Sequence, residues 1–102
     1  MNSVKGLSIS VFFPAYNDEK SIPTLVETAV AVLRENTSDF EVIVVNDGSQ
    51  DGTAAVLETL RVKHEPYVRI VTHPENRGYG AALRSGFAAA RKQFVFYTDG
   101  DG

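Results

Sequence analysis

The sequence predicts an α/β fold in three layers (α/β/α), with a mainly parallel β-sheet between helices on both of its faces. Four short segments rich in β-branched and aromatic residues alternate with three longer segments whose apolar residues recur at helical spacing. The short segments are apolar at nearly every position, which is typical of strands buried on both faces. The resulting order, βαβαβαβ, favours parallel strands joined by right-handed helical crossovers.

The expected strands are identified by composition and by the turn residues that follow them. They cover residues 8–13, 40–45, 67–71 and 94–97. Pro14 stops the first strand, because proline cannot donate a hydrogen bond to a neighbouring strand.

The expected helices cover residues 22–33, 51–65 and 80–92. The first carries a continuous apolar stripe, and Ser21 before it is a suitable N-cap. The third is rich in alanine and contains Gly86, and such small residues let a helix approach a sheet closely at some cost in helix propensity.

Length and composition limit the chain to one soluble domain. The chain has 102 residues, of which 43% are hydrophobic and 23% charged, and its net charge is −3. A nucleic-acid partner is disfavoured because there is no cluster of basic residues, and the pair Arg91–Lys92 is interpreted as a solvated helix end. There is no cysteine, so disulfides and thiolate metal sites are excluded. No apolar run approaches the roughly 20 residues of a membrane span, and we expect a cytoplasmic location.

Polar and acidic residues follow the expected strands. Asp18 follows the first strand, Asp47 the second, and Asp99 and Asp101 the fourth. The carboxyl ends of parallel strands meet at one edge of the sheet, which is where ligands bind in folds of this class. The sequence therefore predicts a ligand site at this edge.

The stretch Asp99-Gly100-Asp101 places two carboxylates one residue apart after a buried strand. Such oxygen ligands suit Mg²⁺ or Mn²⁺, and either ion can also hold a diphosphate. The bound metal would neutralise the charge that develops on a diphosphate leaving group. The alternative is an ordinary acidic turn.

Asp47 lies at the ligand edge, where its carboxylate can accept hydrogen bonds from a base or a ribose. Gly48 after it permits a sharp turn. Ser49, Asp51 and Thr53 are interpreted as turn and capping residues, with Ser49 or Asp51 as the cap of the second helix.

The turn after the first strand contains Pro14 and Tyr16. The tyrosine ring could stack on a base, and the backbone of the rigid turn could form hydrogen bonds with the edge of that base. The alternative is a strand stop with a partly buried tyrosine.

Gly78 and Gly80 precede the third helix, where backbone N–H groups can meet a phosphate. Arg77 and Arg84 could face a diphosphate there. The alternative is that both arginines are solvated. The spacing does not match the phosphate-binding loop of nucleotide triphosphatases.

The two histidines, His64 and His73, are isolated in the sequence and receive no predicted role. The spacings of serine, histidine and aspartate support no catalytic triad.

Taken together, the four strand ends resemble the family-2 glycosyltransferases, which share the nucleotide-sugar-binding fold called GT-A. The stretches that carry this resemblance are Pro14–Asn17, Asn46–Thr53, Asn76–Arg84 and Tyr97–Asp101. The resemblance covers nearly the whole chain, and the four motifs occur in the order and spacing of the family. The last two stretches are most similar to the branch that transfers a sugar to a polyprenyl phosphate, the dolichol-phosphate mannose synthase type.

The resemblance implies a metal-dependent, inverting transfer of a sugar from a UDP- or GDP-linked donor, in cell-wall, polysaccharide or glycolipid biosynthesis. The implied acceptor is a polyprenyl phosphate or a saccharide, and the implied cofactor is Mg²⁺ or Mn²⁺. The implied nucleotide-sugar ligands are Pro14, Tyr16, Asp18, Asp47 and Asp99, and the metal ligands are Asp101 and Asp99. The sequence departs from the family at Asn46, where an aspartate is usual.

The family's catalytic domain continues well beyond its Asp-x-Asp motif. We therefore expect residues 1–102 to be the nucleotide-sugar-binding, Rossmann-like part of a GT-A domain, with the acceptor site and the general base beyond Gly102. No catalytic residue is assigned within the chain, and we expect it to bind the donor without transferring the sugar. Its last strand would be an unprotected edge that invites self-association. Membrane association of the full-length protein is left open.

Two alternatives are weaker. A nucleotidyltransferase that forms nucleotide sugars usually has a glycine-rich basic loop after the first strand, whereas residues 14–20 contain no glycine. A receiver-like signalling domain needs an acid pair after the first strand and a phosphorylated aspartate after the third. Asp18 and Glu19 would fit the first requirement, but His73-Pro74 follow the third strand.

Overall fold

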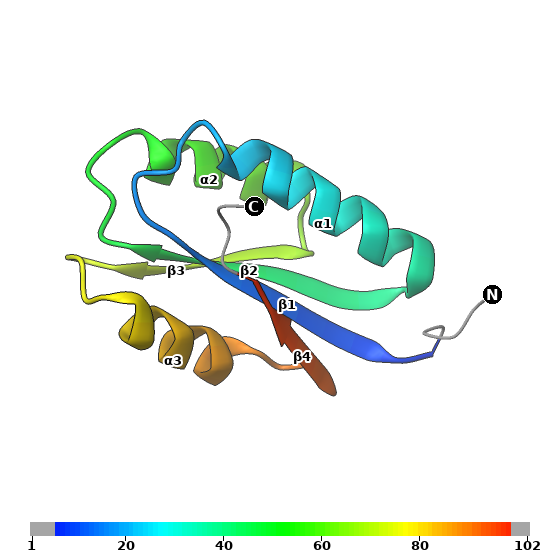
Figure 1. The fold of residues 1–102 in the computed structure, drawn as a ribbon. Helices are drawn as coiled ribbons and strands as arrows, with labels where there is room; N and C mark the ends of the chain where they lie inside the picture. The colour runs from blue at the N-terminus through cyan, green and yellow to red at the C-terminus, as the bar shows by residue number, and fades with distance from the viewer. Residues whose placement is uncertain (1–5, 99–102) are drawn as a thin grey trace.

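The computed structural model describes residues 6–98 and confirms the expected order of strands and helices (Figure 1). Its elements are β1 (Ser8–Ala15), α1 (Ile22–Asn36), β2 (Asp39–Asp47), α2 (Thr53–Lys63), β3 (Val68–His73), α3 (Tyr79–Ala89) and β4 (Phe94–Tyr97). The strands form one sheet in the order β3-β2-β1-β4, and every neighbouring pair is parallel. The predicted parallel, Rossmann-like α/β fold is therefore confirmed.

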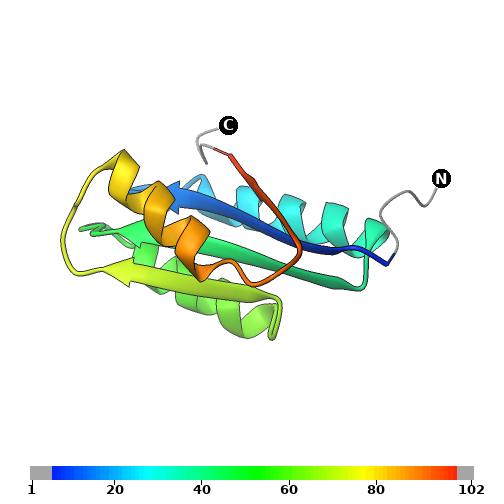
Figure 2. The ribbon, with the colours of Figure 1, turned by 90° about the horizontal axis from the view of Figure 1, so that it is seen from below.

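The helices cover both faces of the sheet. Helices α1 and α2 lie on one face, and α3 lies on the other (Figures 1 and 2). The strand order runs from β1 through β2 to β3, and then returns to place β4 on the other side of β1. Right-handed crossovers require the helix to change face when this direction reverses. The order thus reverses beside β1, and in open α/β sheets ligands bind beyond the carboxyl ends of the strands at such a point.

The core is centred on β2, where every residue after Asp39 is buried. On the α1–α2 face, the strands pack against one continuous apolar cluster from both helices. On the other face, the fully buried Phe12 packs against α3. A methyl group on Gly86 would overlap the Phe12 ring, so this position requires glycine. The predicted close approach of the third helix to the sheet is confirmed.

The helix boundaries differ from the sequence expectations at five of the six ends. The expectation that Pro14 stops the first strand is also wrong, because β1 continues through Pro14 to Ala15 where it pairs with β2 alone. Helix α1 follows the predicted N-cap Ser21, although the serine side chain makes no capping hydrogen bond. Helix α2 is shorter at both ends than residues 51–65, and its N-cap is Gly52. The Asp51 carboxylate still satisfies the helix start, because it accepts hydrogen bonds from the backbone N–H of Thr53 (2.9 Å) and from the Thr53 hydroxyl (2.6 Å).

Helix α3 ends at Ala89, so the interpretation of Arg91–Lys92 as a helix end is wrong. The reason is the buried Glu41 carboxylate on β2, which accepts the backbone N–H of Arg91 at 2.8 Å. The backbone N–H of Lys92 donates to the Ser10 hydroxyl at 3.1 Å. These two bonds draw the chain away from the helix and onto the sheet.

Glu41 is a charged group inside a segment that the sequence shows as apolar. Its carboxylate also accepts the Ser10 hydroxyl at 2.6 Å and the Arg69 guanidinium at 2.9 Å. Burial acts to raise the pKa of Glu41, but the hydrogen bonds from Ser10, Arg91 and Arg69 outweigh it and hold the pKa below its ordinary value. The network joins β1, β2 and β3 to the segment that leads into β4.

Strand β4 lies at one edge of the sheet and pairs with β1. Its aromatic side chains are largely exposed, with Phe96 at 57% and Tyr97 at 49% of their maximal accessible area. The expectation of an uncovered last strand is confirmed for residues 6–98. Within that range no helix has the length and apolar character needed to cross a membrane.

Candidate functional site

A pocket lies at the carboxyl ends of β1 and β2, next to the start of α3. Its volume is about 390 Å³, and it is lined by Pro14, Ala15, Tyr16, Asp18, Asp47, Asn76, Gly78, Tyr79 and Ala82. Four of the six predicted ligand residues therefore meet in one place, although they come from segments that are far apart in the sequence. The other two, Asp99 and Asp101, lie outside the described residues.

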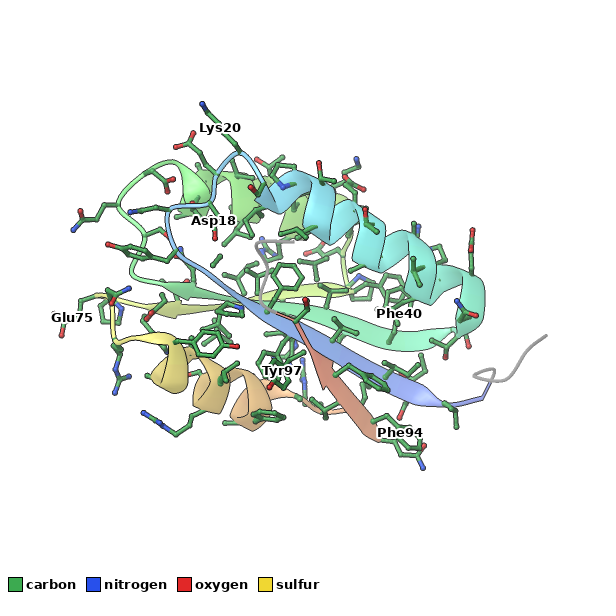
Figure 3. All side chains as sticks on the ribbon, in the orientation of Figure 1. Asp18, Lys20, Phe40, Glu75, Phe94 and Tyr97 are labelled. Atoms are coloured by element: carbon green, nitrogen blue, oxygen red, sulfur yellow. The ribbon has the colours of Figure 1, made fainter. Side chains whose placement is uncertain are left out.

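A second, larger pocket of about 620 Å³ lies at the opposite end of the sheet, beside Arg34, Phe40 and Tyr67. Figure 3 shows this separation, with Asp18 and Glu75 near the carboxyl ends of the strands and Phe40 toward the other end. None of the predicted site residues lines the larger pocket. Since ligands of parallel α/β sheets bind at the carboxyl ends of the strands, the smaller pocket is the candidate site.

The turn after β1 is fastened to the turn after β2. The backbone N–H of Asn17 donates to the Ser49 hydroxyl at 3.0 Å, and the Asn17 side-chain oxygen accepts the backbone N–H of Gln50 at 2.8 Å. Asn17 adopts a positive φ of 53°, which asparagine tolerates better than most residues. The backbone N–H of Asp18 donates to the Thr53 hydroxyl at 2.9 Å. Ser49 and Thr53 therefore have the structural role expected for them.

The turn after β1, held by these hydrogen bonds, presents two side chains to the pocket. The ring of Tyr16 is 44% exposed and is accessible for stacking. Asp18 is partly buried, and its carboxylate accepts the backbone N–H of Tyr16 at 3.3 Å. Both residues remain accessible to a ligand.

The turn after β2 tolerates the departure from the family at Asn46. The Asn46 side-chain oxygen accepts the backbone N–H of Ser49 at 3.1 Å, a bond that an amide oxygen makes as a carboxylate would. Gly48 has a φ of 74°, and any side chain on it would collide with the backbone of Glu75 and Asn76. The turn therefore needs glycine at this position.

Asp47 is buried and accepts four hydrogen bonds from the last residue of β3 and the segment that follows it. One oxygen accepts from His73 Nδ1 (2.7 Å) and the backbone N–H of Arg77 (2.9 Å). The other accepts from the backbone N–H of Gly78 (3.0 Å) and the side-chain amide of Asn76 (3.2 Å). Burial acts to raise the pKa of Asp47, but the hydrogen bonds from His73, Arg77 and Gly78 outweigh it and lower the pKa.

A carboxylate has about four acceptor positions, so the Asp47 carboxylate is fully used in this structure. It lines the pocket, but it would have to release one donor before it could accept a hydrogen bond from a base. Direct contact between Asp47 and a nucleotide therefore remains a prediction. What the structure shows is that Asp47 holds the wall of the pocket in place.

The glycine-rich stretch before α3 differs from its predicted use. Gly78 is the N-cap of α3 with a φ of 96°, and its N–H group is bonded to Asp47 rather than open to a phosphate. The N–H of Arg77 is bonded to the same carboxylate. The side chains of Arg77 and Arg84 are exposed and do not line the pocket, so the structure favours the solvated alternative for both.

Sequence reasoning missed His73. The histidine is buried between Asp47 on β2 and Ser85 on α3, and its Nε2 lies 2.7 Å from the Ser85 hydroxyl. The sequence spacings support no catalytic triad, but they also do not show that Ser85, His73 and Asp47 form one chain of hydrogen bonds. A signal was present, because Asp47 and His73 end neighbouring strands and are register partners.

Comparisons with known proteins agree with this site. The family model "Glycosyl transferase family 2" matches residues 10–102. A dolichyl-phosphate beta-glucosyltransferase of Drosophila melanogaster is 39% identical over 102 residues, which cover 94% of this chain and 31% of that protein. An undecaprenyl-phosphate 4-deoxy-4-formamido-L-arabinose transferase of Pseudomonas fluorescens is 33% identical over 93 residues, which cover 91% of this chain and 27% of that protein.

Two solved structures are also similar. A mannosyltransferase from Pyrobaculum calidifontis in complex with GDP-Man and Mn²⁺ gives a TM-score of 0.79 at 26% identity, covering 93% of this chain and 28% of that one. A glucosyl-3-phosphoglycerate synthase from Mycobacterium tuberculosis in complex with Mn²⁺, UDP and glucosyl-3-phosphoglycerate gives a TM-score of 0.73 at 27% identity, covering 94% of this chain and 34% of that one. The chain thus spans about a third of the length of the proteins it matches. On the strength of the family match over residues 10–102, this chain belongs to glycosyl transferase family 2.

Proposed function

We propose that the chain binds a nucleoside diphosphate sugar in the pocket at the carboxyl ends of β1 and β2, and that the whole protein transfers the sugar to a polyprenyl phosphate. One observation supports the location of the donor site. Pro14, Tyr16, Asp18 and Asp47, all expected from the sequence to contact the donor, line the same pocket. Two relatives are named as a dolichyl-phosphate and an undecaprenyl-phosphate transferase, and these names support a polyprenyl phosphate as the acceptor. A saccharide acceptor is the second candidate.

The described residues would bind and orient the nucleotide. The exposed ring of Tyr16 provides a surface on which a base can stack, and the partly buried Asp18 carboxylate can accept hydrogen bonds from a base or a ribose. Pro14 and the turn after it, which is hydrogen-bonded to the turn after β2, hold both groups in place. The Asp47 carboxylate fixes the opposite wall through its bonds to Arg77 and Gly78. A preformed pocket of this kind reduces the entropy lost when the ligand binds.

The metal part of the proposal depends on Asp99 and Asp101. Among residues 6–98, no group of three or more histidine, aspartate and glutamate side chains could hold a metal ion. Two carboxylates are a suitable set for Mg²⁺ or Mn²⁺, which usually complete their coordination with water and substrate phosphates. The two solved relatives described above contain Mn²⁺. When bound, the ion would neutralise charge on the diphosphate leaving group.

We assign donor binding to this chain and acceptor binding, together with the general base, to other parts of the whole protein. The reason is that the chain matches only 31% of the Drosophila relative and 27% of the Pseudomonas relative. We also propose that the exposed edge of β4 can pair with a second copy of the chain, since Phe94 and Phe96 are exposed there.

Calorimetric titration of UDP and GDP into the chain, with and without Mn²⁺, tests the proposal. We expect micromolar to low-millimolar binding of one nucleotide, strengthened by metal and weakened in Tyr16→Ala and Asp101→Ala. Arg34→Ala is the matched control, because Arg34 lines the pocket at the opposite end of the sheet. Binding that is unaffected by Tyr16→Ala but lost in Arg34→Ala would move the site to the other pocket. No binding of either nucleotide would contradict donor binding by this chain.

A further inference from the structure

His73 is a buried, titratable side chain that the proposed function does not use. Its ring is 5% exposed, with Nδ1 2.7 Å from the Asp47 carboxylate and Nε2 2.7 Å from the Ser85 hydroxyl. Both ring nitrogens therefore have a partner. The histidine links the end of β2 to the middle of α3, which are 38 positions apart in the sequence (85 − 47).

We propose that His73 is a positioning residue of the nucleotide site. The inference rests on the proposed function, because it assigns His73 the task of holding the wall of that pocket. His73 orients Asp47, and Asp47 in turn holds the backbone of Arg77 and Gly78. Gly78 and Tyr79 both line the pocket.

The direction of the hydrogen bonds supports this role. The ionised Asp47 carboxylate can only accept, so His73 Nδ1 carries the proton and donates to it. Nε2 lies 2.7 Å from the Ser85 hydroxyl and forms the second hydrogen bond of the ring. One chain of hydrogen bonds therefore joins Ser85, His73 and Asp47.

These bonds attach α3 to the sheet at two points. Asp47 holds its N-cap, Gly78, and His73 holds Ser85 inside the helix. Two attachments fix both the position and the rotation of α3, whose first residues form one side of the pocket. Without the bond from His73, one buried oxygen of Asp47 would keep only the N–H of Arg77, and an undersatisfied buried carboxylate is costly.

A catalytic triad is the competing interpretation of Asp47, His73 and Ser85. Ser85 lies in the interior of α3, where backbone N–H groups donate to carbonyls of the preceding turn. They are therefore not available to stabilise an oxyanion, which a nucleophilic serine requires. Ser85 also does not line the pocket. The geometry favours positioning over nucleophilic catalysis.

Two conservative variants separate the two bonds of His73. Asparagine can place its amide nitrogen near Nδ1 and keep the donor to Asp47, whereas glutamine reaches toward Nε2 and keeps only the bond to Ser85. Phenylalanine keeps the ring and removes both bonds. We would measure the Kd of UDP and GDP with Mn²⁺ for His73→Asn, His73→Gln and His73→Phe, together with the backbone amide NMR signals of Arg77 and Gly78.

We expect His73→Phe to weaken nucleotide binding by about ten-fold, the scale of losing one hydrogen bond to a charged group. The amide proton signals of Arg77 and Gly78 should move upfield as their bonds to Asp47 lengthen. His73→Asn should restore both readouts and His73→Gln should not. If His73 had only a structural role, His73→Asn and His73→Gln would not differ in these readouts.

Unchanged affinity and unchanged amide signals in folded His73→Phe would overturn the inference, and so would equal rescue by glutamine and asparagine. If His73→Phe does not fold, the comparison of His73→Asn with His73→Gln decides the question alone. If the wild-type chain binds no nucleotide, the proposed function fails, but the amide signals of Arg77 and Gly78 still test whether His73 positions the wall.

Discussion

The hydroxyl of Thr53, at the start of α2, accepts the backbone N–H of Asp18 at 2.9 Å and thereby fixes a residue of the candidate site to a helix that is not part of it. The same hydroxyl donates to the Asp51 carboxylate at 2.6 Å. Thr53 itself is fully buried, and both bonds are partly buried. The shape of the pocket therefore depends on a side chain outside it.

Thr53→Val keeps the shape of the side chain and removes both bonds. We expect the free energy of unfolding to fall by about 1 kcal/mol, because the backbone N–H of Asp18 and the carboxylate of Asp51 each lose a hydrogen bond. Urea denaturation followed by circular dichroism measures the change. Thr59→Val on the exposed side of α2 is the control, with an expected change within about 0.5 kcal/mol. Equal effects of the two substitutions would contradict the role given to Thr53.

Gly86→Ala introduces a methyl group where the Phe12 ring lies. We expect a loss of about 1–3 kcal/mol or more in the free energy of unfolding, despite the better helix propensity of alanine, because the packed core has no space for it. Gly80→Ala in the same helix should be neutral or stabilising by up to about 1 kcal/mol, since its nearest neighbour, Arg84 Nη1, is 3.5 Å away. If Gly86→Ala left the free energy of unfolding unchanged, α3 would not be packed as closely against Phe12 of β1 as described.

Glu41→Gln tests the buried carboxylate that joins three strands to the start of β4. The pKa of Glu41 is lowered from its ordinary value of 4.5 in the folded chain. Its contribution to stability is therefore present above that ordinary value and is lost as the pH falls through the lowered folded-state pKa. We expect the variant to be less stable at pH 7 and to lose less stability than the wild type on acidification. Exposed Glu35→Gln serves as control, and parallel pH profiles for wild type and Glu41→Gln would contradict the expectation.

Sugar transfer by the chain alone is the fourth prediction. With UDP- or GDP-linked radiolabelled sugars, Mn²⁺ and dolichyl or undecaprenyl phosphate, we expect no product above background. The reason is that the chain matches less than a third of the length of the two transferases described above. Substantial turnover by these 102 residues would show that the acceptor site and general base lie within them.

The order of elements could be predicted because each strand is a short apolar run and each helix has its own periodicity. The ligand candidates could be predicted to meet at one edge because they lie at or just after the ends of strands, and the carboxyl ends of parallel strands share one edge. Four of them do meet there. The sequence could not show that the Asp47 carboxylate is already used by the turn after β3, since those bonds depend on how the loops fold back.

The missed features are polar groups whose partners are distant in sequence. Glu41 lies within an apolar run, and only its contacts with Ser10 and Arg69 explain how a charge is tolerated there. Helix α3 ends three residues before the predicted Lys92 for the same reason, because the N–H of Arg91 bonds to Glu41. His73 was isolated in the sequence, although its register with Asp47 could have been anticipated from the ends of the two strands.

Amide chemical-shift mapping during a titration with UDP or GDP in the presence of Mn²⁺ would show whether a nucleotide binds at the carboxyl ends of β1 and β2. We expect saturable shifts centred on Tyr16, Asp18 and Gly78, with little change at Arg34 and Tyr67. Shifts centred on Arg34 and Tyr67, or no saturable shift with either nucleotide, would rule out a nucleotide site at this edge of the sheet.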